Sequence, residues 1–149
     1  MKAYLFDLDG TLADLSHRLH LIQGEKKDWN AFFEACDSDA PIQHVITLAQ
    51  TLLASDDIYV LFVSGRSDQV RKKTLAWLNL HVDSHLSDLD IYMRREGDHR
   101  PDNIVKGELL DRIIADGYEP IMAFDDRDQV VKMWRERGIP CAQVAEGAF

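Results

Sequence analysis

The chain has 149 residues, of which 46% are hydrophobic and 29% charged, with a formal net charge of −9. This length and composition are typical of one globular domain with its own core, so we expect a single domain over residues 1–149. The acidic balance argues against a protein that follows a long nucleic-acid backbone, because such proteins present a basic face.

The sequence also bears on the cellular compartment. No apolar run has the length of a membrane span or the pattern of a secretory signal. Cys36 and Cys141 lie far apart and lack metal-ligand spacing, so we interpret them as reduced thiols that serve packing. We therefore expect a protein of the cytoplasm with no membrane contact.

The first predicted element is a strand at Lys2–Phe6, a short apolar run. The segment that follows, Leu12–Ala40, contains two short helical patterns and no convincing strand. Its two apolar stripes are Leu15, Leu19 and Ile22, and then Trp29, Phe32, Phe33 and Cys36, with Asp28 as a predicted N-cap. A helical insertion directly after the first strand is well placed to act as a cap, so we predict a small helical cap over residues 12–40.

After the insertion, helical and strand patterns alternate. Further strands are predicted at Ile58–Val63, Leu89–Met93, Ile121–Phe124 and Cys141–Val144. Four helices are predicted from apolar residues at helical spacing. The first carries Ile42 to Leu53 after Pro41, and the second carries Val70 to Leu78 after the N-cap Ser67. The third runs from about Asp102 to near Gly117 with Leu109, Leu110, Ile113 and Ile114 inward, and the fourth carries Val130 to Trp134 and ends at Gly138. This alternation predicts an α/β fold, a parallel five-stranded sheet with helices on both faces.

Polar clusters follow four of the predicted strands. They are Asp7–Thr11, Ser64–Arg66, Arg94–Lys106 and Asp125–Asp128. In an open parallel sheet, ligands bind at the carboxyl ends of the strands, so these clusters are expected to meet at one site.

The combined residue types suit phosphoryl transfer. An aspartate can attack phosphorus if a cation suppresses its repulsion from the phosphate, and Mg²⁺ with oxygen ligands suits that task. Asp7 and Asp125 could supply such oxygens, Lys106 a fixed positive charge, and Ser64 a hydroxyl for the phosphate. Asp9, two residues after Asp7, could act as the acid and then the base.

Each cluster taken alone has a simpler interpretation. Asp-x-Asp-Gly-Thr can be a polar turn, and Asp125-Asp126 can be acidic residues favoured at a helix N-terminus. Their order at successive strand ends favours the functional interpretation. The pairs His17/His20 and His81/His85 have no acidic or cysteine partner for zinc and are interpreted as solvated.

Four stretches match the four motifs of the haloacid-dehalogenase-like (HAD) phosphohydrolases, which have a Rossmann-like sheet. The stretches are Phe6–Thr11, Val63–Arg66, Gly97–Lys106 and Phe124–Trp134. With the tail Gln143–Phe149, the chain more closely resembles the phosphatase domain of phage polynucleotide kinase/3′-phosphatases. The resemblance covers nearly the whole chain outside the insertion.

This resemblance implies roles for individual positions. Asp7 would be the nucleophile and Asp9 the general acid/base, with Lys106 also in the catalytic set. Mg²⁺ would be held by Asp7, Asp125 and the Asp9 carbonyl, with Asp126 close by. The implied substrate-binding positions are Thr11, Arg18, Ser64, Gly65, Arg66 and Asp102. Asn103 and Ala148 depart from acidic residues of the pattern.

The expected function is therefore a Mg²⁺-dependent phosphomonoesterase that acts through an aspartyl-phosphate and removes a 3′-phosphate from a nucleic-acid end. Arg66, Arg94, Arg95 and Arg100 could bind neighbouring phosphates. The alternative substrate is a small molecule such as a nucleoside monophosphate, as in a 5′-nucleotidase. A non-enzymatic phospho-accepting module is a further hypothesis, which a general base at Asp9 disfavours. No kinase motif is found, so no kinase domain is expected on this chain.

Overall fold

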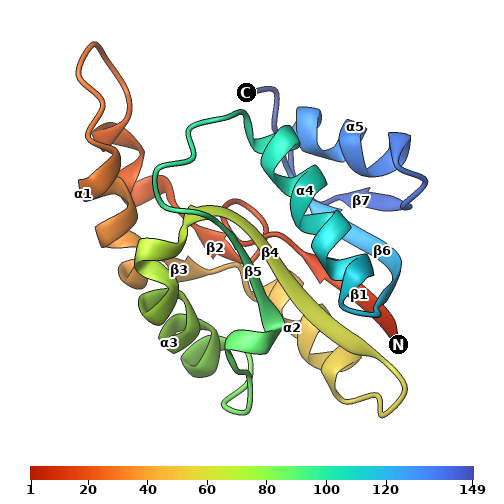
Figure 1. The fold of residues 1–149 in the computed structure, drawn as a ribbon. Coiled ribbons are helices and arrows are strands. Elements are labelled where there is room, and N and C mark those ends of the chain that lie inside the picture. Colours follow the sequence, from red (N-terminus) through yellow and green to blue (C-terminus); the bar gives the residue numbers. More distant parts are fainter.

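A parallel five-stranded sheet forms the centre of the computed structural model, which describes residues 1–149 (Figure 1). Its strands are β1 (Lys2–Phe6), β4 (Tyr59–Ser67), β5 (Ile91–Arg94), β6 (Glu119–Asp125) and β7 (Cys141–Gln143). They lie in the order β5-β4-β1-β6-β7. The chain proceeds outward from β1 through β4 and β5, then crosses to β6 on the other side of β1. In open α/β sheets ligands bind where the strand order reverses, which is here the carboxyl end of β1.

Helices cover both faces of the sheet, as the sequence predicted. On one face lie α2 (Gln43–Leu53) and α3 (Arg71–His81), and on the other α4 (Asp102–Ala115) and α5 (Asp128–Glu136). The alternation of side chains along β1 divides the core accordingly. Phe6 packs in the cluster with α2 and α3, whereas Ala3 and Leu5 pack in the cluster with α4 and α5. The predicted α/β class is therefore confirmed.

The insertion between β1 and α2 projects from the body of the fold (Figure 1). It contains two 3₁₀ helices, η1 (Ser16–Leu21) and η2 (Ala35–Ser38), and between them α1 (Trp29–Glu34). The Asp28 carboxylate accepts a hydrogen bond from the Ala31 N–H at 3.0 Å, which confirms the predicted N-cap.

Two expectations for the insertion were wrong. Its ends are joined by a short antiparallel pair, β2 (Ala13–Asp14) with β3 (Ala40–Pro41), where no strand was predicted. Strands of two residues are too short to show alternation. The first helical pattern forms a 3₁₀ rather than an α-helix, and its one fully buried side chain is Arg18 rather than a leucine.

Smaller differences concern the ends of elements. Leu89 lies in the 3₁₀ helix η4 (Asp88–Asp90) before β5 and is 81% exposed, and Ile114, predicted to face inward, is 49% exposed. The Ser67 side chain accepts from the Gln69 N–H at the start of η3 (Asp68–Val70), which precedes α3. Cys36 and Cys141 are free and buried, as predicted. No helix has both the length and the apolar character to cross a bilayer.

Candidate active site

The predicted site residues meet at the carboxyl end of the sheet. Asp7 directly follows β1 and its N–H donates to the Phe124 carbonyl at 3.0 Å, so it continues the ladder with β6. Asp125 is the last residue of β6. Lys106 lies one turn into α4, four residues after Asp102, and so points back over the strand ends.

Three carboxylates and one ammonium form the centre of the site. Oxygens of Asp7, Asp125 and Asp126 lie within 4.8 Å of one another, and all three residues are buried. The Lys106 Nζ is 2.7 Å from Asp7 Oδ1 and 2.8 Å from Asp125 Oδ2. The Thr11 hydroxyl donates to the other oxygen of Asp7 at 3.0 Å. Both Asp7 oxygens are therefore fixed in direction.

The charges of this centre do not cancel. Three carboxylates and one ammonium leave a net formal charge of −2 in a buried place. Burial and the Asp125 carboxylate accordingly raise the pKa of Asp7 well above its usual range, despite Lys106. An all-oxygen donor set with a deficit of two positive charges fits a hard divalent cation. Asp7, Asp125 and Asp126 could hold such a metal.

Close backbone approaches shape the same centre. Gly10 has φ +85°, and a Cβ there would lie 2.1 Å from the Asp126 carboxylate. At Gly147, in the C-terminal tail, a Cβ would lie 1.9 Å from the Asp126 carbonyl oxygen. The loop that carries Asp125 and Asp126 is thus held between the turn after β1 and the tail.

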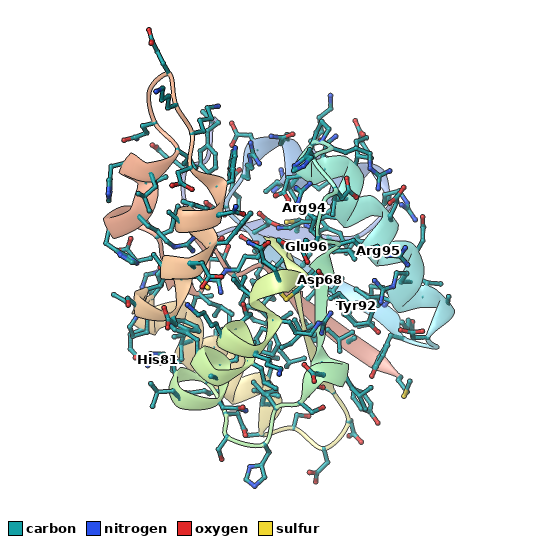
Figure 2. The ribbon with its side chains drawn as sticks, turned by 60° about the vertical axis from the view of Figure 1, so that its left-hand side comes forward. Asp68, His81, Tyr92, Arg94, Arg95 and Glu96 are labelled. Carbon is teal, nitrogen blue, oxygen red and sulfur yellow. The ribbon has the colours of Figure 1, made fainter.

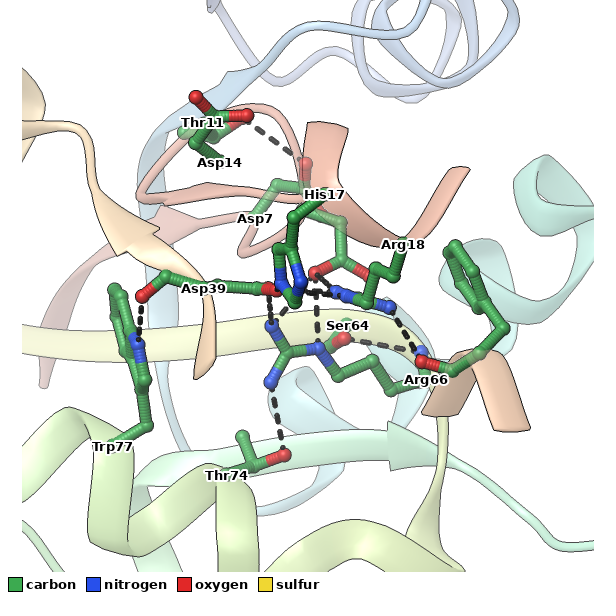
Figure 3. Close-up of polar contacts among 12 residues, drawn as sticks. Asp7, Thr11, Asp14, His17, Arg18, Asp39, Ser64, Arg66, Thr74 and Trp77 are labelled. Atoms are coloured by element: carbon green, nitrogen blue, oxygen red, sulfur yellow. Dashed lines mark hydrogen bonds and ion pairs between the residues drawn. The ribbon is translucent and has the colours of Figure 1, made fainter. Parts of the chain in front are cut away.

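A second cluster is formed by two arginines and two aspartates. Figure 3 labels Arg18, Arg66 and Asp39 of this cluster, with Asp7 and Thr11 of the first. Arg18 and Arg66 both donate to Asp9, at 2.8 and 2.7 Å, and both donate to Asp39, at 2.7 and 3.1 Å. Further hydrogen bonds fix its members, from Arg66 to the Thr74 hydroxyl and from the Trp77 indole to the Asp39 carbonyl. Here the formal charges cancel, so this cluster needs no cation.

Asp39 was not among the residues that the sequence predicted for the site. It is 3% exposed and comes from the end of the insertion, which the motifs do not cover. One signal could have suggested a further acid at the site. Arg18 and Arg66 carry two positive charges, and Asp9 can neutralise only one of them. His17 was interpreted as solvated. It is half-exposed, and its Nε2 lies 2.6 Å from Asp39 Oδ1.

Asp9 shows an asymmetry between its two oxygens. Oδ1 accepts three hydrogen bonds, from Arg18 and twice from Arg66, whereas Oδ2 accepts none. Burial disfavours the charged carboxylate, but the two guanidiniums outweigh burial and hold the pKa of Asp9 below its usual range. Its side chain remains 24% exposed. One oxygen is therefore anchored and the other is available for proton transfer.

Ser64 and Gly65 lie where the ladder between β4 and β5 shifts register, a common device beside active sites. The Ser64 hydroxyl accepts from the Arg66 N–H at 3.0 Å. A Cβ at Gly65 would lie 2.0 Å from Asp102 Oδ1, so only glycine allows this approach. Arg94 binds the Gly65 carbonyl at 2.7 Å and Asp102 at 3.3 Å.

The arginines expected to bind neighbouring phosphates mostly contact protein groups instead. Arg66 is fully buried with Asp9 and Asp39, Arg94 also donates to two carbonyls of its own loop, and Arg100 pairs with Asp98 and Glu108. Arg95, labelled with Arg94 in Figure 2, is exposed, and its guanidinium has no hydrogen bond, ion pair or aromatic contact. Only Arg95 of these four has a guanidinium free to bind a ligand.

The sheet order, the insertion after β1 and the aspartates at the strand ends define the class of haloacid dehalogenase-type phosphatases. Solved structures of that class share the fold, among them a class C acid phosphatase from Bacillus anthracis with TM-score 0.67 and 12% identity, over 97% of this chain and 68% of that one. Within the class, the chain matches the model of the polynucleotide kinase PNKP phosphatase domain over residues 1–149 and belongs to that family.

More similar relatives are larger proteins. The chain is 31% identical over 139 residues to an Autographa californica nuclear polyhedrosis virus protein named as a putative bifunctional polynucleotide kinase/RNA ligase. A chain from the structure of a Pnkp1/Rnl/Hen1 complex has TM-score 0.81 and 35% identity, over 99% of this chain. The present chain spans 18% of the viral protein and 47% of the chain from the complex.

Proposed function

We propose that this chain is a Mg²⁺-dependent polynucleotide 3′-phosphatase in which Asp7 is the nucleophile and Asp9 the general acid/base. The observation that carries the proposal is the contrast between two adjacent clusters. The cluster around Asp7 lacks two positive charges, whereas the cluster around Asp9 is neutral and leaves one oxygen free. The first suits a cation and a phosphate, and the second suits proton transfer.

In the first step, an Asp7 oxygen would attack phosphorus as the bond from phosphorus to the substrate's 3′-oxygen breaks. Lys106 and Thr11 hold the Asp7 carboxylate in place for attack. When bound to Asp7, Asp125 and Asp126, Mg²⁺ would neutralise the carboxylates and the non-bridging phosphate oxygens. Asp9 Oδ2 would donate a proton to the departing 3′-oxygen.

In the second step, Asp9 would take a proton from water, which attacks phosphorus and releases inorganic phosphate from Asp7. The lowered pKa of Asp9 keeps its carboxylate ionised, so that it can accept this proton. The acid role in the first step requires a proton on Asp9, and a bound phosphate would favour that proton by adding negative charge nearby. Arg18 and Arg66 would keep the carboxylate oriented in both steps.

The chemistry is tested by Asp7→Asn and by chelation. Asp7→Asn should abolish phosphate release from a 3′-phosphorylated oligonucleotide while leaving the circular dichroism spectrum unchanged. Removal of divalent cations should also abolish release, and Mg²⁺ should restore it. Wild-type turnover by Asp7→Asn would refute the nucleophile assignment, and full activity in chelator would refute the metal.

The family and the unpaired guanidinium of Arg95 support a nucleic-acid end as the substrate. Each of the other nine arginines has a hydrogen bond, an ion pair or an aromatic contact within the protein. Arg95 follows β5, and β5 pairs with the strand that carries Ser64 and Gly65. We infer that it binds the phosphodiester next to the terminal 3′-phosphate, a group that a mononucleotide lacks.

Arg95→Gln should therefore raise KM about 10- to 150-fold for a 3′-phosphorylated oligonucleotide, since a charge-assisted hydrogen bond contributes roughly 1.5–3 kcal/mol. It should not change KM for a nucleoside 3′-monophosphate. Arg100→Gln removes the same charge from the same loop and is the control, because Arg100 already pairs with Asp98 and Glu108. Hydrolysis of mononucleotides alone would favour the small-molecule alternative. Both DNA and RNA ends should be assayed, since a chain 33% identical to this one comes from the structure of a Pnkp1/Rnl/Hen1 RNA repair complex.

A further inference from the structure

Trp134 provides a contact to the candidate metal site that the proposed chemistry does not use. It lies on α5, is 1% exposed and packs in the core cluster formed with α4. The apolar pattern of the sequence explains why Trp134 is buried, but it does not predict a partner for the indole N–H. Its indole Nε1, however, donates to Asp125 Oδ2 at 3.3 Å. A polar contact from the core therefore reaches a carboxylate of the candidate metal centre.

The other hydrogen bonds of Asp125 make this contact informative. Oδ1 accepts from the backbone N–H groups of Asp126 and Arg127, at 2.9 and 3.2 Å. Oδ2 accepts from Lys106 Nζ at 2.8 Å and from the indole. Of these donors, two come from the same loop, and one is the Lys106 ammonium, which is shared with Asp7 Oδ1. Trp134 is the rigid donor from outside the loop.

A rigid donor fixes the rotation of a carboxylate about its Cβ–Cγ bond. The two backbone donors hold Oδ1, and a second fixed direction at Oδ2 leaves one orientation of the Asp125 carboxylate plane. Partners that orient a ligand in this way commonly change metal affinity about 10- to 100-fold when removed. The donor here is a ring buried among apolar side chains, so its position is set by core packing.

We propose that Trp134 is a positioning residue that orients Asp125 for Mg²⁺ through its indole N–H. The inference rests on the proposed function, because it requires that Asp125 be a metal ligand. It assigns to a core residue of α5 a direct influence on metal affinity.

The chain offers a matched control. It has three tryptophans, and Trp77 is also buried and also uses its indole N–H, which donates to the Asp39 carbonyl at 2.9 Å. Trp134→Phe and Trp77→Phe each replace a buried indole by a smaller ring and remove one hydrogen bond. Only the first removes a donor to the carboxylate centre.

The affinity of each protein for Mg²⁺ should be measured by calorimetry, with urea unfolding as a measure of stability. Trp134→Phe should raise the dissociation constant of Mg²⁺ about 10- to 100-fold, and Trp77→Phe should leave it within about twofold of wild type. Turnover by Trp134→Phe should recover at high Mg²⁺. Unchanged affinity in Trp134→Phe, or an equal loss in both variants, would overturn the proposal.

The wild-type protein provides a second test that does not depend on whether the variants fold. The indole N–H groups give three separate signals in a ¹⁵N-correlated NMR spectrum, since there are three tryptophans. Saturation with Mg²⁺ should shift the Trp134 signal, because its acceptor becomes a metal ligand, and should leave that of Trp77 in place. An unmoved Trp134 signal in protein that binds Mg²⁺ would refute the positioning role, whereas failure of the wild type to bind Mg²⁺ would refute the metal site itself.

Discussion

Asp7 and Asp9 are two residues apart, yet their surroundings affect ionisation in opposite directions. Burial and Asp125 raise the pKa of Asp7, whereas Arg66 and Arg18 overcome burial and lower that of Asp9. A nucleophile must be ionised and a general acid protonated, so both pKa values must move for the first step. A cation at Asp7 and a phosphate beside Asp9 would move them in the required directions. Asp7 and Asp9 therefore need the bound cation and the bound phosphate to reach the ionisation states that the first step requires.

The role of Asp9 leads to a prediction about Asp9→Asn. An amide can neither protonate the departing 3′-oxygen nor activate water, so turnover should slow at least about 100-fold, and the aspartyl-phosphate that does form should persist. Acid-quenched reactions with a ³²P-labelled 3′-phosphate would show labelled protein on a gel. Asp56→Asn, at an exposed loop position, is the control and should remain unlabelled. A fully active Asp9→Asn would exclude the assigned role.

The two thiols allow a prediction about pH. Burial is the main cause that raises the pKa of both, to about 11 for Cys141. At pH 9 an unperturbed thiol with a pKa of 9.0 is half ionised, whereas Cys141 stays protonated and therefore unreactive. A chromogenic disulfide should label neither cysteine in the folded protein at pH 9, and both in urea. Rapid labelling of the folded protein would show that the thiols are accessible.

At the scale of elements, the site depends on places where backbones come close. The turn after β1 and the C-terminal tail enclose the Asp125–Asp126 loop, and glycines at positions 10 and 147 permit this. In contrast, Gly107 lies inside α4, and a Cβ at this position would have no neighbouring atom nearer than 3.8 Å. These glycines should respond differently to the same substitution.

Gly107→Ala should stabilise the protein by roughly 0.5–1 kcal/mol, because alanine favours helix and finds room. Gly147→Ala should destabilise it by about 1–3 kcal/mol, because the new methyl must displace the Asp126 backbone. Urea unfolding would measure both, and calorimetry should show weaker Mg²⁺ binding for Gly147→Ala only. Equal stabilities of the two variants would contradict the close approach.

At the scale of the whole molecule, the charge of −9 limits how a polyanion can bind. The phosphate contacts that we propose are those of the site and of Arg95, so only one or two phosphates should be held. For single strands each held phosphate contributes about −0.7 to the slope of log affinity against log salt. We therefore expect a slope between about −0.7 and −1.4, and a KM that stops falling beyond a few nucleotides. Steady-state kinetics at several salt concentrations and oligonucleotide lengths would test this. A slope steeper than about −3 would indicate an extended basic contact.

Local patterns in the sequence determined the class of fold and most of the site. The short-range signals were the alternation along β1, the apolar stripes of α2 to α5 and the polar residues after the strands. The observed parallel sheet and its two core clusters confirmed the fold that these signals predicted. The positions of Asp7, Asp125 and Lys106 followed because parallel strands bring their carboxyl ends together. The strands β2 and β3 of the insertion were not predicted, because a strand of two residues is too short to show an alternating pattern.

Only the tertiary structure decided which charges neutralise one another. Asp39 lies 21 residues from Arg18 and 27 from Arg66, and nothing in the spacing indicates that it faces both. Nor does a helical stripe show that the indole of Trp134 reaches Asp125, or that Arg94 and Arg100 are engaged while Arg95 is free. The sequence determined which groups arrive at the sheet edge, because local periodicity sets the strands and helices. The fold determined their partners, because burial makes each charge depend on neighbours that are distant along the chain.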